Sequence, residues 1–480
     1  MILKGYLFSF LYVILCVLLA MLAYKLGSPK KYTRKIVHIL VGFEWVILYH
    51  FIPSSIHSIV ICVVFTLLLL ISYLKKLMPM MSSDGDNDPG TVYYGVAMTV
   101  MAVISYFNPD FSLAFGIAVF CTSFGDGFAG VFGSLSKRYN VKIYNNKTLV
   151  GYLSGVIFSF LSVMVFSAAF ELQISALNAF VISVLCSGVE LISRFGLDNL
   201  FIPLSTSAVS YLVIFNSELL WKYILPIVIT PYVVAFVLSK GILTPKGVVI
   251  ALFMDLAVSV AFGNFGFIYL LAFLLLSVVV DKLKKRLNRK NDEVSKKGDK
   301  RDGLQVLANG LIPSLMAVIY ICTHNSIFIV AYCAGLAEAF SDTCASGFGV
   351  LSKKTYDVTR FKPIKGGLSG GVSLIGTIAS FIAAIIFPMI AVAFGVLSFK
   401  FVLIVGACAF LGALFDSVLG SLLQVKYRCD ECTAITEKII HCDRPTVYHS
   451  GVKWIDNDVV NLFSTLFAVI VAMVVYVLMQ

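Results

Sequence analysis

The chain has 480 residues, of which 59% are hydrophobic and only 13% are charged. A soluble domain is about half apolar and about a quarter charged, so this composition excludes a soluble globular protein. The formal net charge of +11 does not indicate a nucleic-acid partner, because the sequence contains no folded basic domain that would present a binding groove.

The apolar residues fall in blocks of about 17–25, the length of a helix that crosses the ~30 Å hydrocarbon layer. Open sheet edges cannot face lipid, and the alternation of barrel strands is absent. We therefore predict an all-α, polytopic transmembrane fold. Sixteen spans are expected, in chain order at residues 5–26, 36–52, 57–74, 91–107, 111–135, 150–170, 174–194, 199–216, 221–239, 247–262, 264–281, 303–322, 326–350, 371–395, 400–425 and 458–479. The short spans 36–52 and 247–262 are candidates for re-entrant or tilted helices.

Lysine and arginine set the expected orientation. If every second connection faces the cytoplasm, starting with residues 27–35, the loops on that side contain all but four of the 37 Lys and Arg. Cytoplasmic loops of membrane proteins are enriched in these residues. We therefore expect a multi-pass protein with both termini outside and its active sites on the cytoplasmic face. Two cytoplasmic loops stand out, a basic loop at 282–302 and a Cys- and His-containing loop at 427–456.

The sequence contains an internal repeat. FGDGFAGVFGSLSK at 124–137 and FSDTCASGFGVLSK at 340–353 are identical at eight of fourteen positions. Three further matches keep the same order: RKIVHILVG at 34–42 with RDGLQVLANG at 301–310, KTLVGYLSG at 147–155 with KPIKGGLSG at 362–370, and LDNLFIPLSTSAV at 197–209 with IDNDVVNLFSTLFAV at 455–469. Such ordered matches indicate two copies of one module. Corresponding spans are offset by an even number, which predicts parallel copies, with domains at 1–222 and 223–480.

Each copy places an aspartate near the inner end of a predicted span, Asp126 and Asp342. A carboxylate at mid-membrane costs roughly 2.5–3.5 kcal/mol and usually marks function. The next loop of each copy contains lysine and glycines, and each glycine is expected to open the following helix. A carboxylate that can hold Mg²⁺, a lysine and a glycine-rich helix N-terminus are the parts of a phosphoryl-transfer site.

We therefore expect Mg²⁺ to be bound through Asp126 and Asp342. Further carboxylates end or open later spans on the same side and are candidates to complete the metal shell or to activate a hydroxyl. The candidate catalytic set is Asp126, Glu190, Asp198, Asp342, Asp416 and Asp456. The alternative for such residues is a transporter with ion-coupling carboxylates at the bilayer midplane. The predicted clusters lie at the cytoplasmic rim instead.

The first copy resembles the phytol/dolichol kinase family of membrane enzymes. The resemblance is carried by RKIVH (34–38), GTVYY (90–94), DGFAGVFG (126–133), KTLVG (147–151) and LDNLFIPL (197–204). It implies CTP as phosphoryl donor and an isoprenoid alcohol as acceptor. The nucleotide- or phosphate-binding candidates in this copy are Arg34, Lys35, His38, Ala129, Gly133, Lys147, Thr148 and Gly151.

The second copy resembles the integral membrane family that includes plant phytyl-phosphate kinase. The resemblance is carried by LTPKG (243–247), QVLANG (305–310), SDTCAS (341–346), KGGLSGGVSLIGT (365–377), DSVLGSLLQ (416–424) and WIDNDVVN (454–461). The binding candidates here are Gln305, Asn309, Lys362, Lys365, Gly366, Gly367, Gln424, Asn457 and Asn461.

Together the resemblances imply a bifunctional kinase that uses CTP or another nucleoside triphosphate. It would convert a polyprenol-type alcohol, such as phytol, geranylgeraniol or farnesol, to the monophosphate and then to the diphosphate. The expected partners are the isoprenoid lipid, the nucleotide and the bilayer. Two alternatives stay open: only one half is active, or the protein is a transporter or scramblase of lipid phosphates.

The loop 427–456 contains Cys429-x-x-Cys432 followed by His441-Cys442. This spacing resembles half of a zinc ribbon, and a disulfide is not expected in a reducing compartment. We expect a structural zinc ion at these four residues. His449 is an alternative fourth ligand, because adjacent residues rarely both ligate well.

Overall fold

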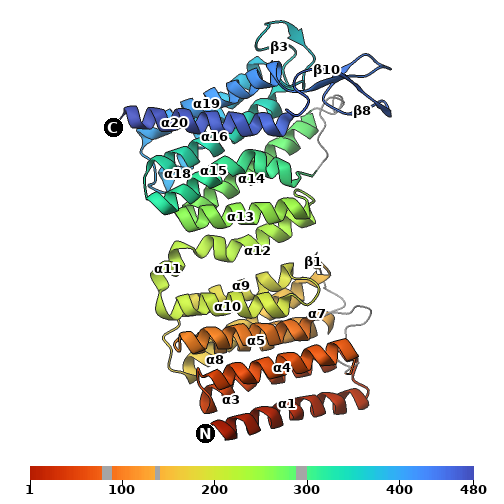
Figure 1. Cartoon of the computed structure of the whole chain (residues 1–480), viewed down its shortest axis with the longest axis vertical. Helices are drawn as coiled ribbons and strands as arrows, with labels where there is room; N and C mark the ends of the chain where they lie inside the picture. The colour runs from red at the N-terminus through yellow and green to blue at the C-terminus, as the bar shows by residue number, and fades with distance from the viewer. Residues whose placement is uncertain (78–88, 136–140, 288–299, 480) are drawn as a thin grey trace. The chain divides into compact units, whose positions relative to one another are not determined.

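The computed structural model describes residues 1–77, 89–135, 141–287 and 300–479 (Figure 1). Within these residues thirteen helices are long and apolar enough to cross a membrane, and two apolar helices are shorter. The fold class predicted from the sequence, a helical integral membrane protein, is confirmed. The count of sixteen spans and the parallel repeat stay predictions. The central part of the basic loop, 288–299, lies outside the described residues.

The chain divides into two compact units, Met1–Phe236 and Val237–Gln480. The boundary falls within helix α12 (Ile224–Ser239). The functional division between residues 222 and 223 stays a prediction.

Unit 1 is built from helices that lie side by side, with a short β-hairpin in one connection (Figure 1). Its elements are α1 (Ile2–Lys25), α2 (Lys30–Val41), α3 (Glu44–Phe51), α4 (Ile56–Lys75), α5 (Gly90–Phe107), α6 (Phe111–Phe120), a π-helical turn η2 (Cys121–Asp126), α7 (Gly127–Leu135), β1 (Lys142–Tyr144), β2 (Lys147–Thr148), α8 (Leu149–Ala169), α9 (Ala176–Ile192), α10 (Asp198–Phe215) and α11 (Ser217–Lys222). The segment from α6 to α7 is two-thirds buried and packs against α8 and α10. It therefore forms the centre of the unit and carries Asp126 within it.

Unit 2 has the same kind of centre in α16, which packs against α14, α15, α17, α19 and α20. Its elements are α13 (Pro245–Phe262), α14 (Asn264–Leu287), α15 (Gly303–Thr323), α16 (Ile327–Gly349), β3 (Thr355–Asp357), β4 (Pro363–Ile364), β5 (Gly371–Val372), α17 (Leu374–Ile386), α18 (Met389–Ala393), α19 (Phe399–Leu422), β6 (Lys426–Arg428), β7 (Ile435–Thr436), β8 (Ile440–His441), β9 (Arg444–Pro445), β10 (Val447–Ser450) and α20 (Asn457–Leu478). The strands form small antiparallel sheets in the orders β4-β3-β5, β10-β6-β7 and β8-β9. Figure 1 shows β3, β8 and β10 gathered at one end of these helices.

The expected span 36–52 is wrong as a single helix. The structure divides it into α2 and α3, with a turn at Gly42 and Phe43. Most of α2 is polar and basic, which is costly to bury in hydrocarbon. A side chain at Gly42 would lie 2.5 Å from the Ser123 hydroxyl, so glycine lets the turn approach η2 closely. The break directs the polar face of α2 toward the centre of unit 1.

The expected span 371–395 also contains a break. Helix α17 ends at Ile386, and α18 starts after Pro388, which lacks the N–H needed to continue a helix. The two pieces together still have the length and hydropathy of a span.

Several helices begin with a side chain that accepts a hydrogen bond from the backbone of the first turn. These caps are Thr148 on α8, Ser175 on α9, Asn216 on α11, Thr244 on α13, Asp302 on α15, Ser373 on α17 and Asp456 on α20. Each cap satisfies an N–H that the helix itself leaves unpaired, and fixes where the helix starts.

Candidate functional site

Asp126 is the central residue of the site in unit 1. It ends η2 and its side chain is only 5% exposed. A π-helical turn widens the helix, and such turns often occur at functional sites. Here the carbonyl groups of Thr122 and Asp126 in this turn accept hydrogen bonds from side chains of another helix. The turn thereby presents a carboxylate and two carbonyl oxygens to the side chains of α2.

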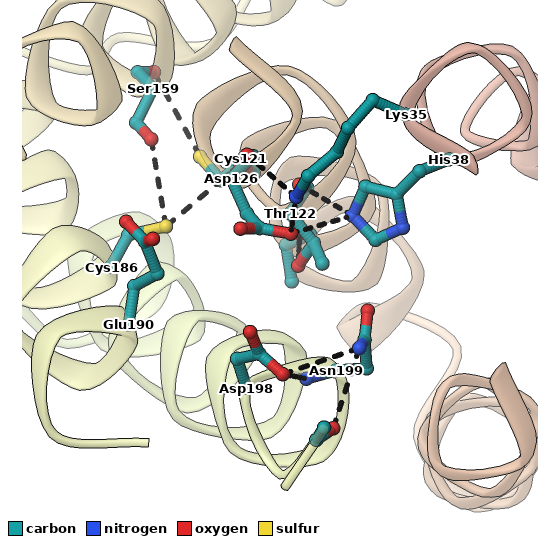
Figure 2. A network of polar contacts seen from close by, with 12 residues as sticks. Lys35, His38, Cys121, Thr122, Asp126, Ser159, Cys186, Glu190, Asp198 and Asn199 are labelled. Atoms are coloured by element: carbon teal, nitrogen blue, oxygen red, sulfur yellow. Dashed lines mark hydrogen bonds and ion pairs between the residues drawn. The ribbon is translucent and has the colours of Figure 1, made fainter. Parts of the chain in front are cut away.

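Lys35 and His38 on α2 bind Asp126 (Figure 2). The Lys35 ammonium donates to Asp126 Oδ2 at 2.8 Å and to the Asp126 carbonyl at 3.0 Å. His38 Nε2 lies 3.2 Å from Asp126 Oδ2 and 3.1 Å from the carbonyl oxygen of Thr122. Because both partners of Nε2 are acceptors, the geometry fits the tautomer with the proton on Nε2, which leaves a lone pair on Nδ1. In Figure 2 that second nitrogen points away from the carboxylate.

Small residues allow α2 to approach this closely. A side chain at Gly130 would meet the Lys35 stem at 2.5 Å, and one at Gly127 would meet Ile39 at 2.7 Å. Glycine at these positions therefore makes room for the basic residues of α2.

A second ion pair lines the same cavity as Asp126. Lys147 donates to Glu190 Oε1 at 2.7 Å and lies 3.9 Å from Asp198 Oδ2. Although burial alone would lower the pKa of the Lys147 ammonium, the carboxylates of Glu190, Asp198 and Asp126 raise it above its usual value. Lys147 is therefore positively charged at neutral pH. In Figure 2 Glu190 lies to the left of Asp126 and Asp198 lies below it.

The glycines of the predicted motifs bring α7 and α8 together. A side chain at Gly151 would lie 3.1 Å from the carbonyl oxygen of Ala129 and 3.4 Å from the Cα atom of Gly133. The Thr148 hydroxyl accepts from the Gly151 N–H and caps α8. Ala129, Gly133 and Gly151 thus act as a close helix contact, which positions Lys147 at the cavity.

Two cavities meet at the Lys35–Asp126 pair. The larger, of about 220 Å³, is mainly polar and is lined by Arg34, Lys35, Asp126, Ala129, Gly130, Gly133, Ser134, Asn146, Lys147, Thr148, Gly151, Tyr152, Ser187, Glu190, Leu191 and Asp198. The smaller, of about 90 Å³, is mainly apolar and is lined by Arg34, Lys35, Val37, His38, Val41, Leu69, Gly90, Thr91, Tyr94, Asp126 and Asn199. Arg34, Lys35 and Asp126 line both. All eight binding candidates of the first copy, and its three carboxylates, line one cavity or the other.

In unit 2 the structure brings together carboxylates and amides from several helices around α16. Asp416 on α19 accepts a hydrogen bond from the Ser464 hydroxyl of α20 at 3.2 Å. In the orientation that satisfies its neighbours, the Asn461 side chain donates to the same carboxylate at 3.2 Å. The Asn309 amide donates to the carbonyl of Gln305 one turn earlier on α15. Asp342 lies on α16, where it interacts electrostatically with Glu338.

Glu338 is a site candidate that the sequence analysis missed. It lies one turn before Asp342, is 1% exposed, and accepts a hydrogen bond from Thr465 at 2.7 Å. Its other carboxylate oxygen, Oε1, is buried and has no hydrogen-bond partner among the described residues. An acidic residue inside an apolar span is itself the signal that would have identified it.

The expectation that Gly366 opens a helix is wrong, whereas phosphate binding by Lys362 and Gly366 stays a prediction. Helix α17 begins at Leu374, capped by Ser373, and the intervening residues form β4 and β5. Lys362, Lys365, Gly366 and Gly367 are exposed on the connection around β4.

The glycine that opens α17 is Gly376. A side chain there would lie 2.8 Å from the Ala345 carbonyl oxygen and 3.1 Å from the Cα atom of Gly349. This contact matches the one that Gly151 makes with Ala129 and Gly133. Strands precede α17 in unit 2, so the glycine that corresponds to Gly151 lies ten residues after Gly366, the position that the sequence match suggested.

The remaining candidates of unit 2 have structural roles in the contacts seen. Asp456 caps α20 by accepting from the backbone of Asp458 and Val459, and Asn457 is the first residue of that helix. Gln424 is buried, and a side chain at Gly451 would lie 2.2 Å from its carbonyl oxygen. Cys429, Cys432, His441 and Cys442 form a separate cluster in the strands between α19 and α20.

Comparison with known proteins matches the chain to an integral membrane family. A family model described as integral membrane protein DUF92 matches residues 228–469. An uncharacterized membrane protein of Methanocaldococcus jannaschii is 36% identical over 165 residues, which cover 33% of this chain and 65% of that protein. Protein PGR of Arabidopsis thaliana is 31% identical over 42% of this chain and 79% of its own length. A phytol kinase of Synechocystis is 30% identical over 38% of this chain and 80% of its own length. No solved structure matches the chain.

Proposed function

The chain belongs to the family of integral membrane proteins described as DUF92, and from this premise we propose that it is a membrane kinase that phosphorylates a prenyl alcohol. Similarity to a phytol kinase supports the reaction class. The observation that carries the proposal is the pair of cavities in unit 1, one polar and one apolar, with the Lys35–Asp126 ion pair between them.

Phosphoryl transfer to a lipid alcohol needs two adjacent subsites of opposite character. The phosphates of the donor require cations and N–H groups, whereas the hydrocarbon chain of the acceptor requires apolar walls. The larger cavity offers Arg34, Lys35 and Lys147 to the phosphates. The smaller one offers Val37, Leu69 and Tyr94 to a hydrocarbon chain. An alcohol in the small cavity would meet the donor at Asp126, where the cavities join.

His38 is placed to accept the proton of the alcohol. It lines the apolar cavity, its Nδ1 has a lone pair when Nε2 faces Asp126, and Asp126 would stabilise the imidazolium that forms. As the proton passes to Nδ1, the alcohol oxygen forms a bond to the γ-phosphorus. The bond from that phosphorus to the bridging oxygen breaks, and the nucleoside diphosphate leaves with the electron pair.

The cations of the large cavity stabilise the charge that this step moves onto the phosphates. Asp126, Glu190 and Asp198 supply carboxylate oxygens of the kind that Mg²⁺ prefers, and a bound Mg²⁺ would neutralise phosphate charge and align the transferred group. Lys147 forms an ion pair with the Glu190 carboxylate. Phosphate binding would therefore exchange one anionic partner of Lys147 for another.

We assign the second phosphorylation, from monophosphate to diphosphate, to unit 2. The support is the aspartate Asp342 at the position of Asp126 in the repeat, and the recurrence of the helix contact at Gly376. CTP as donor and a cytoplasmic position of both sites belong to this proposal. They rest on the sequence resemblance and on the distribution of Lys and Arg.

The test is a product analysis with purified full-length protein in lipid. Labelled CTP or ATP is supplied with phytol, geranylgeraniol or farnesol, and lipid mono- and diphosphates are separated. The proposal expects a monophosphate that precedes a diphosphate with at least one alcohol. Formation of the monophosphate alone would restrict the activity to one unit. No lipid phosphate with any pair, in protein that binds the alcohols, would favour a transporter or scramblase.

A further inference from the structure

The cysteine and histidine cluster between α19 and α20 forms a site that the proposed function does not use. We propose that Cys429, Cys432, His441 and Cys442 bind one zinc ion, which fastens the strand-containing connection of unit 2 over the helices that carry Asp416 and Asn461. The inference is independent of the reaction that the protein catalyses.

The ligand atoms are already close to a coordination shell. One ligand atom from each of the four residues lies within 4.8 Å of all the others. The ring nitrogen Nδ1 of His441 lies 3.5 Å from Cys432 Sγ and 3.2 Å from Cys442 Sγ. Around tetrahedral zinc, with bonds of about 2.3 Å to sulfur and about 2.0 Å to nitrogen, ligand atoms are roughly 3.5–3.8 Å apart. Small side-chain movements therefore suffice to enclose the ion.

Local backbone structure explains why four ligands converge from two short segments. Cys429 directly follows β6, and its N–H donates to the carbonyl of Ala434, which closes a tight turn around Cys432. His441 ends β8 and Cys442 starts the turn to β9. Cys442 has a φ of 51°, in the left-handed region, and this turns its thiol toward the same side as the neighbouring imidazole.

With this conformation the adjacent residues His441 and Cys442 can both bind one ion. His449, the alternative fourth ligand, is not part of the cluster.

The donor set favours zinc. Three thiolates and one imidazole in tetrahedral arrangement are typical of structural zinc sites, whereas Mg²⁺ and Ca²⁺ require oxygen ligands. A disulfide would use only two of the three thiols, and none of the three forms one in the structure.

The site is connected to both flanking helices of unit 2. The N–H of Val425 donates to the carbonyl of Ile455, and the N–H of Val452 donates to that of Leu423. These bonds tie the end of α19 to the residues just before α20. Glu437, between the two ligand pairs, accepts a hydrogen bond from the backbone of Ser369 at 2.9 Å. Zinc therefore closes a connection that holds the start of α20 and the segment before α17.

The test measures zinc in the purified full-length protein, prepared without a polyhistidine tag. Elemental analysis should find about one zinc per chain, with iron and copper well below that ratio. C432S and H441A should each lose most of it. C322S and H449A are matched controls, since Cys322 is exposed on α15 and His449 lies on β10 outside the cluster, and both should keep the zinc.

A second measurement keeps the inference testable if a ligand variant fails to fold. A mercurial reagent added to folded wild-type protein should release zinc in proportion to the thiols that react, and cobalt taken up in its place should give thiolate-to-cobalt absorption. Wild-type protein without zinc that also takes up no cobalt would overturn the proposal. Zinc that stays in C432S and H441A at the wild-type level would overturn it too. Neither readout depends on kinase activity.

Discussion

At the residue scale, the protonation of His38 decides what its imidazole can do. With Nε2 facing the Asp126 carboxylate and the Thr122 carbonyl, Nδ1 is left to accept a proton. H38Q removes the basic nitrogen while its amide can still donate to the carboxylate. A general base contributes about 10²–10⁴-fold to a rate, so single-turnover phosphorylation of the alcohol should slow by that factor, with nucleotide affinity changed by less than about tenfold.

The control for this prediction is H57Q, because the His57 ring pairs with the Tyr6 hydroxyl away from the site. Turnover in H38Q within about threefold of wild type, far below the factor expected for a general base, would exclude His38 as the base.

The aspartates of the two copies should separate the two phosphorylations. D126N keeps the size of the side chain but removes the charge that pairs with Lys35, and should abolish conversion of alcohol to monophosphate while added monophosphate is still converted. D342N should do the reverse and let monophosphate accumulate. Product analysis by chromatography reads both steps, with D110N, in an exposed loop, as control. Loss of both steps in each variant would instead indicate one composite site.

The sequence identified most residues of the candidate site in unit 1, but not which of them form ion pairs with one another. Asp126, Lys35, His38, Lys147 and Glu190 were all candidates, and all line the two cavities. That Lys147 would bind Glu190 rather than remain open to phosphate does not follow from sequence, because their distance depends on how α8 and α9 pack. Glu338 could also be recognised from the sequence, because it is an acidic residue within an apolar span.

At the element scale, the residue at which a helix begins identifies equivalent positions in the two units better than sequence identity does. The similar sequences at 147–155 and 362–370 suggested that Gly366 opens a helix, yet Gly366 lies in the connection between β4 and β5, and Ser373 caps α17 instead. Capping residues and close glycine contacts follow the backbone itself, so they identify equivalent positions even where a loop has gained residues. The π-helical turn η2 could not be predicted, because its sequence does not differ from that of an ordinary helical span.

The two glycines give a matched test of this correction. A side chain at Gly376 would lie 2.8 Å from a backbone oxygen, whereas one at Gly366 would approach only the Thr355 hydroxyl, at 3.5 Å. G376A should therefore push α16 and α17 apart, with a loss of about 1–3 kcal/mol as for overpacked cores, and G366A should be tolerated. Thermal unfolding in detergent measures the difference. A lower melting temperature in G366A than in G376A would instead support the sequence alignment that pairs Gly151 with Gly366.

At the scale of the whole molecule, hydropathy was sufficient to locate nearly every apolar helix, because burial in lipid imposes length and composition directly. It failed at 36–52, where α2 carries basic residues that line the cavities of unit 1. The direction in which the helices cross is a prediction that rests on Lys and Arg alone.

Accessibility of single cysteines tests that direction. In a background without the exposed Cys322, Cys432 and Cys442, K142C and K354C should react with an impermeant maleimide only from the cytoplasmic side. N325C should react only from outside, since it lies in an opposite loop. Reaction of both K142C and K354C from outside would reverse the topology and exclude a cytosolic nucleotide as donor.

The most direct measurement for the central claim follows the phosphates of the donor. CTP labelled at the γ-phosphate and CTP labelled at the α-phosphate are supplied in parallel to the full-length protein with a prenyl alcohol in lipid vesicles. A kinase transfers only the γ-label to the lipid, and D126N should prevent this transfer. Label from the α-phosphate in the lipid would instead show transfer of the nucleotide. With CTP, ATP and every alcohol tested, an unlabelled lipid phase would contradict phosphoryl transfer by this protein.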